Sequence, residues 1–266
     1  MISLMQLLKE VQGKPVAILL AGAPGAGKGS VLRDLDLSGL KTLNLDDTIA
    51  ALSKTDGFTL NQKAADAEDR SKFMKAMATA TKKLKGEQIP QAIANGESFI
   101  LDGTSASKNQ TIKLTNELKE AGYEVMMLYV YTDLERSLKQ NERRFEKSGG
   151  EDRSLAPAIV MRTWKSVTEN LPKYADLFGF NFVAVANTLD DRMQDIDKII
   201  NKYLKPFTPT GTKPKTPDQQ KKSDERKAKD KEEIQAMLAD DFIYDVIEYT
   251  MSKEEAQMRL KQFLSK

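Results

Sequence analysis

The feature that most constrains this chain is an apolar run that stops at a glycine-rich turn containing a lysine. The run covers residues 17–21, and the turn after it reads Gly22-Ala23-Pro24-Gly25-Ala26-Gly27-Lys28-Gly29-Ser30. Glycines let successive backbone N–H groups converge on phosphate oxygens, and a helix that follows directs its positive end at them. A Gly-x-x-x-x-Gly-Lys turn after a strand predicts a nucleotide phosphate site at residues 22–30, with Lys28 reaching the β- and γ-phosphates. The alternative is a turn that only joins a strand to a helix.

One position of this turn departs from the common phosphate-loop pattern. Gly29 stands where Ser or Thr ordinarily supplies a hydroxyl to Mg²⁺, and Ser30 comes one residue later. We expect Ser30 to contribute to a metal site through water.

The composition limits the chemistry that the chain can perform. Its 266 residues include no cysteine and no histidine, which excludes disulfides, thiolate nucleophiles, serine–histidine hydrolysis and histidine- or cysteine-ligated metals. Carboxylates, amines, guanidinium groups, hydroxyls and a hard cation remain, and they are sufficient for phosphoryl transfer. The 41 basic and 39 acidic residues give a net charge of +2, so binding to nucleic acid is possible but not favoured.

Five short apolar runs alternate with helical patterns along most of the chain. They cover residues 15–21, 41–45, 98–101, 124–131 and 181–186. Nearly continuous apolar strands between helices predict an α/β fold whose parallel sheet is covered on both faces. Ligands bind beyond the carboxyl ends of such strands. The long polar stretch between the second and third runs is expected to be mostly helical and to carry the pocket for an acceptor substrate.

The composition changes sharply after residue 204. We expect a main domain over residues 1–204 with a lid at about 144–156, a linker rich in Pro, Lys and Thr over 205–222, and a helical tail over 223–266. Apolar residues at helical spacing predict that the tail forms a helical hairpin, which docks either on its own domain or on a protein partner. No stretch is apolar and long enough to span a membrane, so a soluble, cytoplasmic protein is expected.

Two aspartates follow predicted strands at the edge of the sheet where the glycine-rich turn lies. Asp46 is the candidate base, because a carboxylate there can accept the proton of an attacking hydroxyl. The alternative is that Asp46 or Asp47 only caps a helix that starts at Thr48. Asp102 follows the apolar run at 98–101 and is expected to hold Mg²⁺ through water or to position the acceptor.

Basic residues gather between the fourth and fifth predicted strands. Arg144 and Arg153 flank Gly149 and Gly150, which would permit a lid to close. Arg143, Arg144 or Arg153 could neutralise charge on a phosphoryl group during transfer. The alternative is a solvated run of surface charge.

These motifs stand in a familiar order. They are Gly22-Ala-Pro-Gly-Ala-Gly-Lys-Gly, Asn44-Leu-Asp-Asp, Ile100-Leu-Asp-Gly-Thr, Gly122-Tyr-Glu-Val, and Asn141-Glu-Arg-Arg through Arg153 to Pro157. Over about residues 14–190 the chain resembles zeta-toxin-like and polynucleotide-kinase-like P-loop kinases.

The resemblance implies a three-layer P-loop kinase fold with a five-stranded parallel core. It also implies ATP (or GTP) with Mg²⁺, and transfer of the γ-phosphate to a hydroxyl of a nucleotide sugar or of a polynucleotide end. By motif position, Lys28 would bind phosphate, Asp46 would be the base, and Arg144 and Arg153 would clamp. Two features differ: the Gly-Lys-Gly variant is more similar to nucleoside monophosphate kinases, and the arginine that relatives often place shortly after the base is missing.

The sequence thus favours a zeta-toxin-like kinase that acts on a nucleotide sugar or other small molecule. A polynucleotide 5′-hydroxyl or nucleoside monophosphate kinase is the nearest alternative enzyme. A different class also stays open, namely a nucleotide-binding scaffold that works through its C-terminal helical tail.

Overall fold

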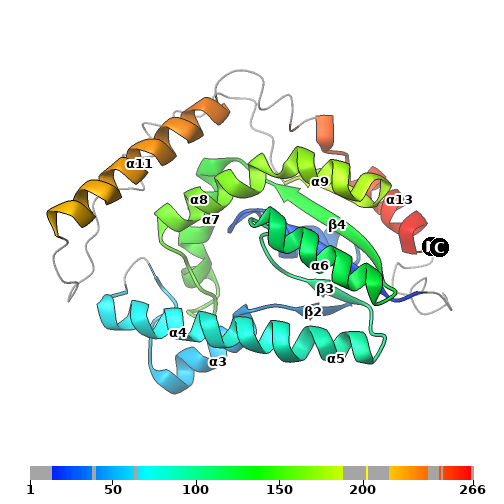
Figure 1. Ribbon diagram of the computed structural model, residues 1–266, viewed down its shortest axis with the longest axis horizontal. Helices are drawn as coiled ribbons and strands as arrows, with labels where there is room; N and C mark the ends of the chain where they lie inside the picture. The colour runs from blue at the N-terminus through cyan, green and yellow to red at the C-terminus, as the bar shows by residue number, and fades with distance from the viewer. Residues whose placement is uncertain are drawn as a thin grey trace.

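The central element of the fold is one sheet of five parallel strands (Figure 1). The computed structural model describes residues 14–37, 40–62, 65–187, 202, 216–238, 246 and 248–264. The strands are β1 (Val16–Ala21), β2 (Lys41–Leu43), β3 (Phe99–Leu101), β4 (Glu124–Tyr131) and β5 (Phe182–Ala186), and their order across the sheet is β2-β3-β1-β4-β5. The expected α/β class and the parallel sheet are confirmed.

Helices connect these strands and cover the sheet. The long connection from β2 to β3 is mostly helical, as expected, and contains α3 (Asp46–Asp56), α4 (Ala67–Lys83), a π-helical turn η1 (Leu84–Gln88) and α5 (Ile89–Ala94). The other described helices are α2 (Lys28–Asp34), α6 (Lys108–Glu120), α7 (Leu134–Lys147), α8 (Pro157–Glu169), α9 (Leu171–Phe178), the 3₁₀ turn η2 (Gly179–Asn181), α11 (Pro217–Leu238) and α13 (Lys253–Leu264). None of the helices in the described ranges is long and apolar enough to cross a bilayer.

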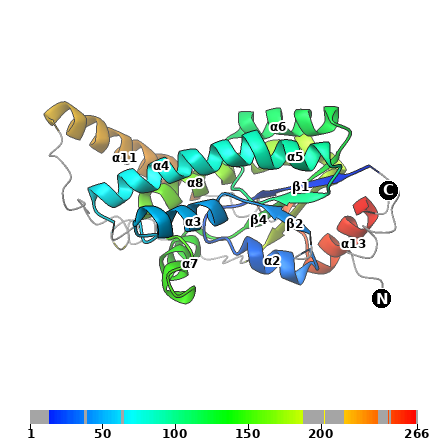
Figure 2. The same cartoon turned by 90° about the horizontal axis from the view of Figure 1, so that it is seen from below.

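The two faces of the sheet are buried against different helices. Because side chains alternate along a strand, Ala17 and Leu19 of β1 lie in a core with residues of α5, α6, α8 and α9. Ile18 and Leu20 lie in a second core with residues of α2 and α13. Figure 2 shows α5 and α6 on one side of the sheet and α2 and α13 on the other. This double burial explains why the strands read as continuous apolar runs.

The strand order brings three polar turns together. Since β3 lies between β1 and β2, the residue after β3 is placed between the glycine-rich turn and the residues after β2. Two backbone hydrogen bonds fix this edge: the Asp102 N–H donates to the Leu43 carbonyl at 2.9 Å, and the Gly22 N–H donates to the Thr104 carbonyl at 3.2 Å. The carboxyl edge of the sheet is therefore a connected surface on which distant residues meet.

The C-terminal helices are present, but they lie at opposite ends of the view rather than side by side (Figure 1). In α11, Ile234 is buried in the first core and Glu233 forms an ion pair with Lys165 of α8. The helix begins at Pro217, whereas the helical tail was expected from residue 223. The residues between the two helices fall largely outside the described ranges.

Helix α13 packs on the second face of the sheet. Its buried side chains Leu260 and Phe263 belong to the same core as α2. Just before the helix, the Met251 N–H donates to the Ala184 carbonyl of β5 at 2.9 Å. The apolar face of α13 therefore packs on its own domain, which decides between the two alternatives for this helix.

Replacing Leu260 with alanine tests whether α13 is part of the cooperative core. Leu260 is 0% exposed, so Leu260→Ala is expected to lower the free energy of unfolding by about 2–5 kcal/mol. Met258 on the same helix is 59% exposed, and Met258→Ala is the matched control with little expected effect. Urea denaturation followed by circular dichroism measures both, and equal midpoints for the two variants would contradict this packing.

Candidate active site

The turn after β1 is shaped by close contacts with α7 and with the residue after β5. At Gly25, where φ is +81°, an added Cβ would clash with the Ser137 carbonyl oxygen. The carbonyl of Pro24 accepts a hydrogen bond from the Ser137 hydroxyl at 2.6 Å, and that of Ala26 accepts one from Asn187 Nδ2 at 2.9 Å. Because C=O and N–H of one peptide point in opposite directions, these contacts turn the N–H of residue 25 away from α7 and the N–H of residue 27 away from Asn187.

The helix that follows the turn begins at Lys28, as the phosphate-loop pattern requires. Lys28 Nζ lies over the loop and donates to the carbonyls of Gly22 at 3.3 Å and Ala23 at 3.5 Å. A Cβ added at Gly29 would meet no atom within 4 Å, so nothing in the described fold requires glycine there. Ser30 is exposed in the first turn of α2.

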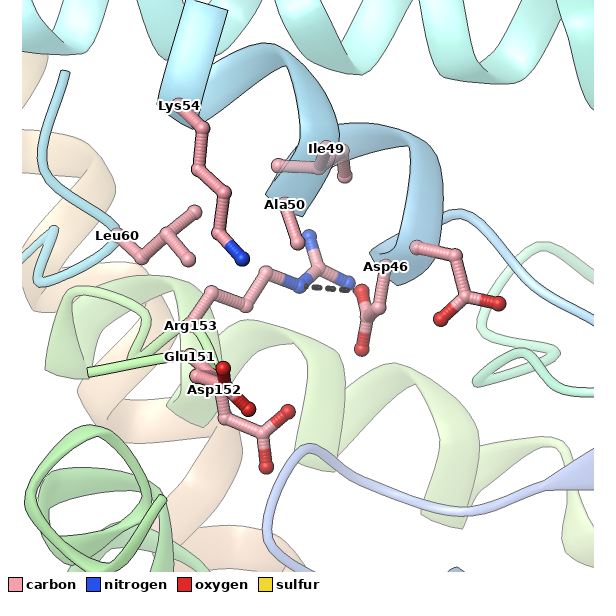
Figure 3. Close-up of a pocket in the computed structure, with 9 residues that line it drawn as sticks. Asp46, Ile49, Ala50, Lys54, Leu60, Glu151, Asp152 and Arg153 are labelled. Carbon is pink, nitrogen blue, oxygen red and sulfur yellow. Dashed lines mark ion pairs between the residues drawn. The ribbon is translucent and has the colours of Figure 1, made fainter. Parts of the chain in front are cut away.

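Asp46, Arg144 and Arg153 form an ionic cluster at the carboxyl edge of the sheet. Arg144 Nη2 donates to Asp46 Oδ2 at 3.0 Å, and Arg153 Nε lies 2.8 Å from Asp46 Oδ1 (Figure 3). This second contact is too bent to be a hydrogen bond, so Asp46 Oδ1 and Arg153 Nε are buried without an aligned partner. Arg144 also pairs with Asp152, with Nε 3.3 Å from Oδ2. The cluster therefore offers buried polar atoms that a ligand could satisfy.

The position of Asp46 differs from the capping alternative raised by the sequence. Helix α3 begins at Asp46 rather than at Thr48, and the Asn44 side chain accepts the Asp47 N–H at 3.0 Å. Asn44 thus provides the cap that was attributed to Asp46 or Asp47.

Lys28 and Asp102 extend this cluster toward the glycine-rich turn. Burial lowers the pKa of the Lys28 ammonium, while the charges of Asp102 and Asp46 oppose that shift. Burial likewise raises the pKa of Asp102, and the charge of Lys28 opposes it. Both groups are half-buried, and a phosphate next to Lys28 would favour its charged form again. Lys28, Asp46, Asp102, Arg144 and Arg153, which the sequence indicated separately, thus lie in one electrostatic unit.

The segment that carries Arg153 is fixed by contacts that the sequence analysis missed. Asn141 of α7 holds the Leu155 backbone on both sides, because its Nδ2 donates to the carbonyl at 2.8 Å and its Oδ1 accepts the N–H at 3.0 Å. The Ser154 N–H donates to the Leu60 carbonyl at 3.1 Å, and the Gln62 N–H donates to the Ser154 carbonyl at 3.0 Å. These contacts anchor the segment on both sides, and a hinge at residues 149–150 stays a prediction.

One signal in the sequence could have identified Asn141. Ser137, Asn141 and Arg144 recur at intervals of four and three residues, which places them on one face of a helix. Ser137 contacts the glycine-rich turn, Asn141 contacts the Arg153 segment, and Arg144 contacts Asp46. One face of α7 therefore joins the three parts of the site.

A cavity of about 230 Å³ opens beside this cluster. It lies between α3, Leu60 and the segment that carries Arg153 (Figure 3). Its lining residues are Asp46, Asp47, Ile49, Ala50, Lys54, Leu60, Glu151, Asp152 and Arg153. Asp46 belongs both to the cavity and to the group of charges around Lys28.

The sequence matches the model of one protein family over most of its length. The family model described as Zeta toxin matches residues 4–202. The chain belongs to the zeta-toxin family. No curated protein sequence matches it significantly.

Solved structures show the fold of this zeta-toxin family member. The crystal structure of AvrRxo1-ORF1:-ORF2 with ATP is similar to this chain, with a TM-score of 0.53 and 15% sequence identity. The alignment covers 100% of this chain and 84% of that chain. A structure from the PezAT chromosomal toxin–antitoxin system of Streptococcus pneumoniae has a TM-score of 0.47 and 15% identity, over 89% of this chain and 93% of that chain. The expected P-loop kinase fold is confirmed.

Substitution of Gly25 tests the shape of the phosphate loop in this zeta-toxin family member. Gly25→Ala is expected to cost about 1–3 kcal/mol of stability because the residue must keep a positive φ and avoid the Ser137 carbonyl. It should also weaken the binding of a non-hydrolysable ATP analogue by about tenfold or more. Gly29→Ala is the matched control, because its Cβ enters open space in a helix. Thermal unfolding and titration calorimetry distinguish the two, and equal losses would argue against this loop geometry.

Removal of the Asn141 amide tests the anchor of the Arg153 segment. Asn141→Ala deletes both hydrogen bonds to Leu155, so amide exchange in residues 153–155 is expected to accelerate about ten- to a hundredfold. Hydrogen-exchange mass spectrometry measures the effect, with Lys139→Ala on an exposed position of the same helix as the control. Unchanged exchange in this segment would show that other contacts hold it.

Proposed function

We propose that this protein transfers the γ-phosphate of ATP or GTP to a hydroxyl of a nucleotide sugar or other small molecule. Its family and its fold support a kinase-type phosphotransferase. The observation that carries the proposal is the place of Asp46, which lines a cavity and at the same time interacts with Lys28 of the phosphate loop. A hydroxyl in the cavity and a γ-phosphate beside Lys28 would meet at this carboxylate.

In the proposed reaction, Asp46 orients the attacking hydroxyl and accepts its proton as transfer proceeds. The hydroxyl oxygen forms a bond to the γ-phosphorus while the bond to the β–γ bridging oxygen breaks and the nucleoside diphosphate leaves. Lys28, Arg144 and Arg153 are the cations that would stabilise the charge on the transferring group. The bent Arg153–Asp46 contact supports this role, since little aligned hydrogen bonding is lost when Arg153 turns to a phosphate.

Mg²⁺, when bound with the nucleotide, supplies charge neutralisation for the phosphates. Asp102 fits this group, because it is a half-buried carboxylate that interacts with the charge of Lys28. The described residues contain no cluster of three or more carboxylates that could hold a metal. Asp102, and Ser30 through water, would therefore hold an ion whose other ligands come from phosphate and solvent.

The alternatives rest on specific features. A polynucleotide kinase would need stacking for successive bases of a strand, and none of the residues that line the cavity is aromatic. A nucleoside monophosphate kinase is suggested by the Gly27-Lys28-Gly29 variant of the loop. A scaffold that only binds nucleotide is suggested by Gly29, but such a protein has no chemical need for Asp46 beside the loop. AvrRxo1-ORF1 and -ORF2 form a complex. A protein partner of this chain would use a surface other than the buried face of α13, such as the exposed first half of α11.

Replacement of Asp46 with asparagine tests the proposed base. Asp46→Asn should lower phosphoryl transfer by about 10²- to 10⁴-fold and leave ATP affinity nearly unchanged. The assay uses γ-labelled ATP, Mg²⁺ and a panel of nucleotide sugars, free sugars, nucleoside monophosphates and 5′-hydroxyl oligonucleotides. Asp56→Asn, at the exposed end of the same helix, is the control.

Two results would contradict the proposal. Label transfer that survives Asp46→Asn would exclude Asp46 as the base. Tight ATP binding with no transfer to any acceptor would favour the scaffold. The scaffold would also be favoured if Lys28→Ala removed nucleotide binding but left a complex formed through the C-terminal tail, and the activity of that complex, unchanged.

A further inference from the structure

The segment that follows Asp102 contains an unusual backbone conformation. In the described part of the chain, two residues other than glycine have a positive φ: Asp36 at +58° and Ser105 at +51°. Asp36 follows α2, where the Leu37 N–H donates to the Leu32 carbonyl and a left-handed residue ends the helix in the ordinary way. Ser105 follows a strand, so no helix end requires this conformation. A residue with a side chain is strained there and keeps this φ only where other contacts hold it.

The hydroxyl of Ser105 explains why glycine does not stand at this position. Its Oγ donates to the Leu20 carbonyl of β1 at 2.8 Å. The ladder between β1 and β3 ends at Leu101, and beyond it the Thr104 carbonyl accepts the Gly22 N–H at 3.2 Å. The Ser105 hydroxyl thus takes the place of a backbone donor and keeps the chain after β3 attached to β1. Glycine would adopt the same φ more readily, but it would lack this donor.

A buried tyrosine holds the other side of Ser105. The hydroxyl of Tyr174 in α9 donates to the Ser105 carbonyl, and the Tyr174 side chain is 0% exposed. Burial raises the pKa of Tyr174, so the hydroxyl keeps the proton that it donates. Asn170, which lies between α8 and α9, donates from Nδ2 to the next carbonyl, that of Ala106, at 3.0 Å. The segment is therefore fixed between β1 and α9.

These contacts set the place of Asp102 relative to the phosphate loop. Gly22 is the shared point, because its carbonyl accepts from Lys28 Nζ at 3.3 Å and its N–H donates to Thr104, two residues after Asp102. On its other side, Asp102 is bonded to β2 through its N–H. The rest of the loop is held separately by α7 and by the residue after β5. Loss of the Ser105 hydroxyl would therefore loosen Asp102 from the loop while the loop keeps its own supports.

We infer that Ser105, held by Tyr174, is a positioning residue that sets the spacing between Asp102 and the phosphate loop. This inference rests on the proposed function, in which Asp102 holds Mg²⁺ and the loop holds the phosphates of the same nucleotide. Both residues act through Asp102 rather than on the nucleotide, as residues behind a ligand side chain do. Without them the phosphates would still bind, but the carboxylate would no longer be held where the ion needs it.

Binding of a non-hydrolysable ATP analogue with and without Mg²⁺ tests the inference and needs no acceptor. Titration calorimetry on the full-length protein gives both affinities, and their ratio is the gain from Mg²⁺. Asp102→Asn defines the largest loss of this gain. Ser105→Ala, Ser105→Gly and Tyr174→Phe should each lower the gain about fivefold, which is the net effect of one hydrogen bond. The affinity without Mg²⁺ should stay unchanged.

Two comparisons separate positioning from a merely structural role. Glycine suits the positive φ and alanine does not, so the urea midpoint should be higher for Ser105→Gly than for Ser105→Ala, while both lose the same gain. Tyr123→Phe is the matched control for Tyr174→Phe. Tyr123 is 4% exposed, and its hydroxyl donates to the Ala92 and Glu97 carbonyls near the amino end of β3. This variant should lower the midpoint and keep the gain from Mg²⁺.

Several results would overturn the inference. One is a gain from Mg²⁺ that is unchanged in both Ser105 variants or that follows their urea midpoints. Another is an equal loss of affinity with and without Mg²⁺, since the loop rather than Asp102 would then have moved. If Mg²⁺ adds nothing to the affinity of the unaltered protein, Asp102 is not its ligand and the inference fails. Failure of the proposed function differs from all of these, because no acceptor then takes phosphate although the gain still responds to the Ser105 variants.

Discussion

The arrangement of the site depends on the pairing of one carboxylate with two guanidinium groups. Asp46 is half-buried at the start of a helix, where an unpaired charge would be costly, and Arg144 and Arg153 offset that cost from two separate segments. Because Arg144 comes from α7 and Arg153 from the segment after it, the ionic cluster draws that whole region over the edge of the sheet. The cavity beside Asp46 exists because these segments meet there.

Helix α7 gives the cluster its rigidity. Ser137 touches the phosphate loop, Asn141 holds Leu155, and Arg144 reaches Asp46, all from one helical face. A displacement of the loop on nucleotide binding would therefore be transmitted by α7 to Arg144, which is part of the same helix, and through Asn141 to the segment that carries Arg153. The contact of Arg153 Nε with Asp46 differs from these contacts, because it is an ion pair without an aligned hydrogen bond.

Local patterns in the sequence predicted the sheet, the phosphate loop and the residues after the strands. Lys28, Asp46 and Asp102 were found because a strand followed by a glycine-rich or acidic turn is a short-range signal, and the parallel order then brings such turns together. The bridge between Asn61 and Ser154 was not predicted, since it joins residues far apart in the chain without a local pattern. The anchor at Asn141 was missed although its helical spacing from Ser137 and Arg144 is a local signal, because that spacing does not show what the face contacts. The separation of α11 from α13 was missed for a related reason: helical spacing shows that a face is apolar, but not which surface it covers. The boundaries of the domains, the lid and the roles of the site residues stay predictions.

The docking of α13 also has a consequence for the order in which the protein can assemble. Helix α2, which begins at Lys28, is buried against the same core as α13, and Lys253 and Gln257 of α13 contact Asp34 at its end. The ribosome makes α13 after every strand of the sheet, so the emerging chain exposes one apolar face until that helix arrives. Contacts so distant in sequence close slowly. A nascent chain can therefore form the glycine-rich turn well before α13 covers the apolar face behind α2.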